Sequence, residues 1–231
     1  MRRIIKTNPP VELNTWLEEN KEYNHSYKDI LGTKAHQMLK EKLLKEQGWL
    51  CAYTGKKIEN ETSHVEHLKP QTTCEEWEDV EYRNVVACFP ADGGDTSHGY
   101  GAPIKGGWWD KENFISPLAD DCERRFKFSW AGHISPNPDD HAAAKKTIAV
   151  LQLDEKSLQL LRKSRIDGFF GFGPRTRAKP LSIADAQLAL ENIDRLDRDG
   201  RLREFCFVLK QLLPKYIANA KAKAKAKAEE K

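Results

Sequence analysis

The sequence predicts an α+β fold in which an irregular central segment lies between helical segments. Three observations lead to this class. Apolar residues recur at helical spacing before residue 48, and again after residue 140. The stretch 49–118 is instead rich in Gly, Pro, His, Cys and Trp. Its apolar runs, such as NVVACF at 84–89, are too short for helices and are typical of strands.

The helices can be placed in order along the chain. Residues 34–47 predict the first, since their apolar side chains share one face and Gly48 is a suitable stop. Helical patterns return in 141–153, 155–166 and 182–196, and Ser182 with Asp185 fits a capping box. These patterns divide the chain into four regions: an N-terminal arm and helix (1–48), a central core (49–120), a helical C-terminal region (121–214) and a Lys/Ala-rich tail (215–231).

Net charge says little about the partner of the folded body. The last eleven residues, KAKAKAKAEEK, hold five lysines and two glutamates, so they account for the whole net charge of +3. The rest of the chain is formally neutral, and any basic surface must be local. We expect the tail to be a solvated helical extension. Because there is no membrane-length apolar run and no signal-peptide pattern, we expect a cytoplasmic protein that does not contact a membrane.

Cysteines are odd in number and widely scattered, which argues against a disulfide framework. We expect free thiols or metal ligands. The five are Cys51, Cys74, Cys88, Cys122 and Cys206.

The central segment gathers side chains that can bind metal, and the densest group is HVEHLKP at 64–70. One interpretation is a structural zinc, which needs four soft ligands closed around the ion. Its candidate ligands are Cys51, His64, His67 and Cys88. A paired zinc knuckle would carry a second cysteine at position 54, where this chain has Thr54.

In the second interpretation, Glu66 holds a hard divalent ion while His67 handles protons. Neighbouring residues of a strand point to opposite faces, so the two side chains serve one substrate only if the strand ends there, and Pro70 supplies such a break. His67 would also need one ring nitrogen bonded to a backbone carbonyl to fix its basic tautomer.

At this point the sequence resembles the HNH endonucleases with a ββα-metal core. The matching segments are CAYT (51–54), VEHLKP (65–70), YRNVVAC (82–88) and HG with KGGWWD (98–110). The start MRRI and the segments at 114–137 and 145–168 are similar to the HNH proteins of retron and Septu antiphage systems. The resemblance covers roughly residues 1–170 and implies a ββα-metal core embedded between helical segments.

The resemblance also implies roles for single residues. Glu66 becomes a metal ligand, His67 the general base, and Asn84 the asparagine whose amide braces the loop that orients this base. A further ligand is expected on the following helix, for which His98 is the best match. An insertion, PADGGDTS at 90–97, separates His98 from Asn84, so Asp92 and Asp95 are substitutes.

The function implied is hydrolysis of nucleic-acid phosphodiester bonds, with DNA ahead of RNA, by one Mg²⁺ or Mn²⁺ ion in a defence system that includes an ATPase subunit. Lys105 and Arg83 are possible phosphate contacts, as is Lys69. Trp108 and Trp109 fit either base stacking or the core. A catalytically silent zinc-bound adaptor that binds nucleic acid or protein stays open as the alternative.

Overall fold

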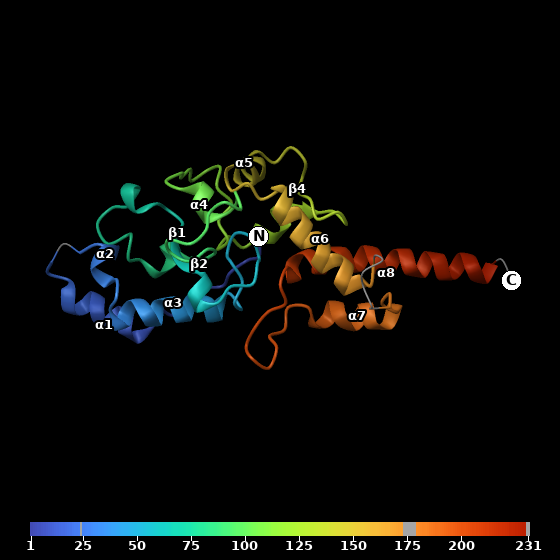
Figure 1. Ribbon diagram of the computed structural model, residues 1–231, viewed down its shortest axis with the longest axis horizontal. Helices are drawn as coiled ribbons and strands as arrows, with labels where there is room; N and C mark the ends of the chain where they lie inside the picture. The colour runs from blue at the N-terminus through green and yellow to red at the C-terminus, as the bar shows by residue number, and fades with distance from the viewer. Residues whose placement is uncertain (24, 173–178, 230–231) are drawn as a thin grey trace.

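The computed structural model describes residues 1–23, 25–172 and 179–229 (Figure 1). Its helices and two small antiparallel sheets confirm the α+β class. The helices are α1 (Val11–Asn20), α2 (Tyr27–Ile30), α3 (Lys34–Glu46), α4 (Ala102–Lys105), α5 (Ala142–Val150), α6 (Lys156–Phe170), α7 (Ile183–Asn192) and α8 (Cys206–Glu229). The strands are β1 (His64–His67), β2 (Val85–Cys88), β3 (Phe126–Phe128) and β4 (Ile134–Pro136).

The predicted helix at 34–47 is confirmed as α3, which begins where the Thr33 side chain accepts a hydrogen bond from the His36 amide. It ends before Gly48, whose positive φ of 59° suits a residue without a side chain. The buried face of α3 packs against β2, so the helix supports the first sheet from one side.

The first sheet consists of β1 and β2, paired antiparallel with His64 opposite Cys88 and His67 opposite Val85. Every residue of β2 is buried, while β1 alternates between half-buried and buried positions. The single-turn helix α4 follows β2 after a loop, so two antiparallel strands and a helix occur in the predicted order.

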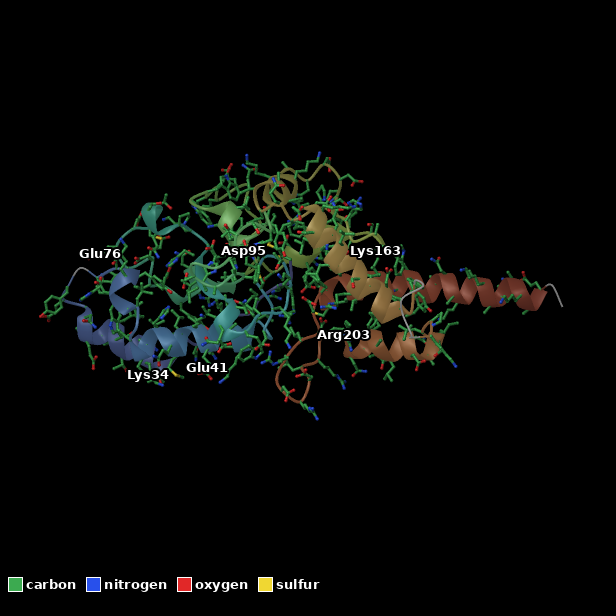
Figure 2. The ribbon with its side chains drawn as sticks, in the orientation of Figure 1. Lys34, Glu41, Glu76, Asp95, Lys163 and Arg203 are labelled. Carbon is green, nitrogen blue, oxygen red and sulfur yellow. The ribbon has the colours of Figure 1, made fainter. Side chains whose placement is uncertain are left out.

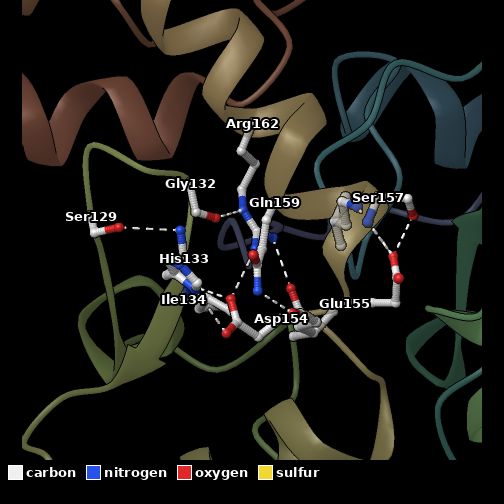
Figure 3. Close-up of polar contacts among 11 residues, drawn as sticks. Ser129, Gly132, His133, Ile134, Asp154, Glu155, Ser157, Gln159 and Arg162 are labelled. Atoms are coloured by element: carbon white, nitrogen blue, oxygen red, sulfur yellow. Dashed lines mark hydrogen bonds and ion pairs between the residues drawn. The ribbon is translucent and has the colours of Figure 1, made fainter.

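The second sheet, β3 and β4, is joined to α6 by the buried guanidinium of Arg162 (Figure 3). Its Nε donates to the Gly132 carbonyl (2.6 Å) and its Nη1 to the Leu153 carbonyl (2.9 Å). Asp154 lies 3.5 Å from Nη2 and accepts a hydrogen bond from the Ile134 amide. A charge this deeply buried is stable only with such partners, so Arg162 fixes the hairpin on α6.

Helix α7 begins as predicted, because the Ser182 side chain accepts a hydrogen bond from the Asp185 amide, and it packs on α8. Figure 1 shows α8 extending beyond the rest of the chain. The predicted boundary at residue 214 falls inside α8, at Pro214. Apolar side chains before this proline are buried, whereas Lys221 to Glu229 are exposed. Residues 221–229 are therefore helical and solvated, as expected of the tail, whereas Tyr216 and Ile217 at its start pack on the core.

One cluster of buried side chains runs from α3 through the first sheet to the start of α8. No helix among the described residues has the length and apolar character needed to cross a membrane.

Candidate active site

The site is built on β1, and its alternation assigns each side chain to a face. His64 and Glu66 lie on the half-buried face, whereas Val65 and His67 lie on the buried one. The strand ends at His67, three residues before Pro70, as the sequence predicted. Beyond the strand, the Leu68 amide still donates to the Asn84 carbonyl (2.8 Å). The loop that connects β1 to β2 therefore begins and ends close together, at Leu68 and Asn84.

Glu66 lies among groups that fix one of its two carboxylate oxygens. Oε1 is 3.0 Å from the ammonium of Lys105 and accepts a hydrogen bond from the Tyr53 hydroxyl (3.3 Å). Both partners are buried, and the Lys105 side chain is only 1% exposed. Lys105 also donates to the His67 carbonyl (2.9 Å). The ammonium therefore holds together the two neighbouring residues of the predicted site and lies in the interior, not at a surface open to phosphate.

The imidazole of His67 is fixed by a backbone carbonyl, as the tautomer argument required. Its Nε2 lies 2.7 Å from the Asp79 oxygen, and since a carbonyl only accepts, Nε2 carries the proton and Nδ1 keeps the lone pair. Nδ1 accepts a hydrogen bond from the Gln71 amide (3.3 Å), and the ring of Tyr27 packs edge-on at 4.5 Å. Burial lowers the pKa of His67, which favours the neutral ring.

Asn84 ties together the two ends of the loop that carries this carbonyl. Its Oδ1 accepts from the Lys69 amide (2.8 Å), and its Nδ2 donates to the carbonyls of Lys69 and Glu78 (both 3.1 Å). Nδ2 also lies 3.3 Å from the Cys74 sulfur. Glu78 precedes Asp79, so the amide of Asn84 holds the backbone beside the oxygen that orients His67. Asn84 thus holds the loop at both ends, while the catalytic role that the resemblance implies for it stays a prediction.

His98 is not on the helix where the further ligand was expected, because α4 begins four residues later, at Ala102. Its ring lies between those of Phe89 (4.9 Å) and Tyr100 (4.5 Å). Asp92 and Asp95 are exposed, and Asp95 is labelled in Figure 2. Asp95 accepts a hydrogen bond from the Ser97 amide and so stabilises its own turn.

Cys51 and Cys88 are buried next to each other, with the Phe89 amide donating to the Cys51 sulfur (3.4 Å). Burial raises the pKa of Cys51, but hydrogen bonds from Cys88, Thr54 and Phe89 outweigh it and lower the pKa to about 5.

The predicted four-ligand zinc site does not form. His64 and His67 lie on opposite faces of β1, and each has a separate backbone partner, Pro90 for His64 and Asp79 for His67. In the part of the chain that the structure describes, no three His, Cys, Asp or Glu side chains are placed to hold one metal ion.

The remaining candidates separate into surface and core. Arg83 is exposed, and the Lys69 ammonium pairs with Glu78. Trp108 and Trp109 both pack on Phe114, with ring centres 5.8 and 5.7 Å away, which favours the core interpretation of the tryptophan pair.

His64 has no role in the nuclease interpretation of the sequence, which uses only Glu66 and His67 of this strand. Its Nε2 lies 3.5 Å from Oε2 of Glu66, and its Nδ1 lies 2.5 Å from the Pro90 carbonyl. The signal was present in the spacing, because residues two apart on a strand share a face.

No family model matches the chain. The chain is 27% identical over 175 residues to a protein of Vibrio cholerae serotype O1 biovar El Tor named "Retron Vc95 putative HNH endonuclease". The aligned region covers 71% of this chain and 82% of that protein. This similarity confirms the resemblance to the HNH proteins of retrons that the motifs indicated.

Proposed function

We propose that this protein is a metal-dependent HNH endonuclease that hydrolyses phosphodiester bonds of nucleic acid in an antiphage defence system. The observation that carries the proposal is the arrangement around His67. A strand end, a braced loop and a backbone carbonyl together hold one imidazole in the tautomer with a basic Nδ1. A core histidine needs a hydrogen-bond partner, but it does not need a loop braced at both ends to supply it.

In this mechanism Nδ1 of His67 removes a proton from the attacking water. The Gln71 amide covers this nitrogen, and because the side chain of Gln71 is exposed, water can displace it. Asn84 is a positioning residue, since it acts through the loop and the Asp79 carbonyl. The packed ring of Tyr27 restricts rotation of the imidazole.

Glu66 fits the role of a metal ligand, because Oε1 already has two donors while Oε2 faces away from them. A divalent ion at this carboxylate would stabilise charge on the phosphate and the leaving oxygen. We propose Mg²⁺ or Mn²⁺ as the ion and DNA ahead of RNA as the substrate. Lys105 stabilises the Glu66 carboxylate from the interior and orients it for the ion.

We also propose that an ATPase subunit of the same defence system controls cleavage. The body of the protein is formally neutral without its last eleven residues, so it lacks the broad basic surface of a nuclease that finds nucleic acid alone. The relative from V. cholerae is named as a retron protein, which supports a role inside a multi-component system.

The test is cleavage of supercoiled plasmid and of single-stranded RNA in added Mg²⁺ or Mn²⁺, with and without the proposed ATPase partner. The critical variant is His67→Gln. The glutamine amide nitrogen reaches the position of Nε2 and can still donate to the Asp79 carbonyl, so the contact is kept while the base is lost. We expect a loss of about 10²- to 10⁴-fold in rate. A folded His67→Gln protein that cuts at the wild-type rate would refute this mechanism.

A further inference from the structure

The half-buried face of β1 presents an imidazole and a carboxylate to each other. His64 and Glu66 are two residues apart, and both side chains are 15% exposed, so they are shielded yet reachable from solvent. The contact joins Nε2 of His64 to Oε2 of Glu66 at 3.5 Å. Two adjacent ligand atoms about 2.1 Å from one ion in a near-octahedral site lie about 3.0 Å apart, so His64 and Glu66 would need to close by about 0.5 Å around an ion.

Each of the two side chains is already oriented by a separate partner. The Pro90 carbonyl accepts from Nδ1 of His64, so Nε2, the nitrogen that faces Glu66, is the one that an ion could bind once it carries no proton. A ring fixed in this way by a backbone carbonyl is typical of histidines that ligate metals.

The carboxylate of Glu66 is also oriented by neighbouring side chains. Lys105 and Tyr53 both contact Oε1 of Glu66, so Oε2 is the oxygen left for an ion. The two prepared ligand atoms are therefore the two that face each other.

Resting on the proposed nuclease function, we propose that Nε2 of His64 and Oε2 of Glu66 are the two protein ligands of the divalent ion, in place of His98. The ring of His98 lies instead between Phe89 and Tyr100. Two protein ligands leave the other coordination positions to water and substrate phosphate, as is usual for Mg²⁺ and Mn²⁺ at nucleic acids.

The mixed ligand pair also predicts which ion is preferred. Carboxylate oxygen suits both ions, but an imidazole nitrogen favours Mn²⁺ over the harder Mg²⁺. The chain is therefore expected to bind Mn²⁺ more tightly than Mg²⁺.

The test measures binding of Mn²⁺ itself, without substrate, by calorimetry and by the electron paramagnetic resonance signal of free Mn²⁺. The full chain is stripped with EDTA and titrated with MnCl₂. The variants are His64→Asn, His98→Ala and Glu66→Gln. In His64→Asn the amide can still donate to the Pro90 carbonyl, so the strand keeps its contact while the ligand nitrogen is removed. Melting temperatures establish that each variant is folded.

We expect His64→Asn to weaken Mn²⁺ binding by about 10- to 100-fold, and His98→Ala to stay within about 2-fold of wild type. If wild type and His64→Asn bind Mn²⁺ equally while Glu66→Gln does not, His64 only forms an ion pair with Glu66 and this inference is wrong, but the nuclease proposal survives. If the wild-type chain binds no Mn²⁺ at millimolar concentration, both proposals fail.

Discussion

Replacing Asn84 with alanine tests whether the loop between β1 and β2 is held by one side chain. Asn84 is only 7% exposed and makes three hydrogen bonds to the main chain, two at Lys69 and one at Glu78. A typical internal hydrogen bond contributes about 1 kcal/mol net, and buried partners left without a bond cost more. The expected loss is therefore about 3 kcal/mol of unfolding free energy, a large part of the stability of an ordinary domain.

The same change should reduce cleavage at temperatures where the variant is fully folded. Without the brace, the Glu78–Asp79 backbone can shift, and the imidazole of His67 moves with the Asp79 carbonyl. We expect a fall of about 10-fold or more in kcat with little change in KM, since misplacement of a catalytic group by an ångström has effects of this order. A purely structural role would change stability without changing the rate of the folded protein.

The assays are urea unfolding and plasmid nicking well below the midpoint of melting. The matched control is Asn192→Ala, because Asn192 is half-buried on α7 and, among the described residues, its side chain bonds the Leu188 carbonyl alone. The control should change the unfolding free energy by less than about 0.5 kcal/mol. If Asn84→Ala costs less than about 1 kcal/mol, or cuts as fast as wild type, the bracing argument is wrong.

Two further variants test the packing of the chain. Gly132→Ala should lower the unfolding free energy by about 3 kcal/mol, because Gly132 has a φ of 84° and an added Cβ would lie 2.2 Å from the Gln159 carbonyl oxygen. The control Gly168→Ala in α6 meets open space and should stabilise the protein slightly. Equal urea midpoints for the two variants would contradict this. Lys6→Met should stabilise the protein at pH 7, because burial lowers the pKa of Lys6 from 10.5 to about 7 and its ammonium has no hydrogen-bond partner among the described residues. Between pH 7 and pH 10.5 the unfolded chain keeps the Lys6 proton while the folded chain loses it, so the stability of the wild type rises with pH. The stability advantage of Lys6→Met should therefore shrink from an upper limit of about 4 kcal/mol at pH 7 to about 1 kcal/mol at pH 10. A stability difference that stays constant with pH would contradict the assignment.

Local patterns predicted α3, α5, α6 and α7, whereas α1, α2 and the first part of α8 were not predicted. The apolar periodicity and the glycine stop placed α3, and Ser182 with Asp185 marked the start of α7. These features depend on neighbouring residues, so a sequence reveals them directly. The burial of Lys105 was not predictable in this way. It depends on Glu66, which lies 39 positions earlier and meets the ammonium only after the chain has folded.

The candidate site, like the fold, was predictable from the sequence only where it depends on neighbouring residues. The end of β1 before Pro70 was predictable from the proline, and the structure has it, whereas the role of Asn84 came only from the resemblance to HNH endonucleases and stays a prediction. The position of His98 depends on the path of the inserted residues 90–97, and nothing in their composition fixes that path. The four-ligand zinc hypothesis failed for a simpler reason, since the spacing of His64 and His67 puts the two rings on opposite faces of a regular strand.

The insertion and the metal-site proposal are physically connected. With α4 beginning only at Ala102, the first turn of this helix presents an alanine, and His98 is held in the preceding loop by aromatic contacts. A site that loses a ligand from the helix can keep its ion only if another element supplies one. The element nearest to Glu66 is its own strand, and the side chain two positions back on the same face is His64. Pro90, the first residue of the insertion, supplies the carbonyl that orients this ring. The insertion that separates His98 from Asn84 thus also supplies the carbonyl that orients His64, the ligand we propose in place of His98.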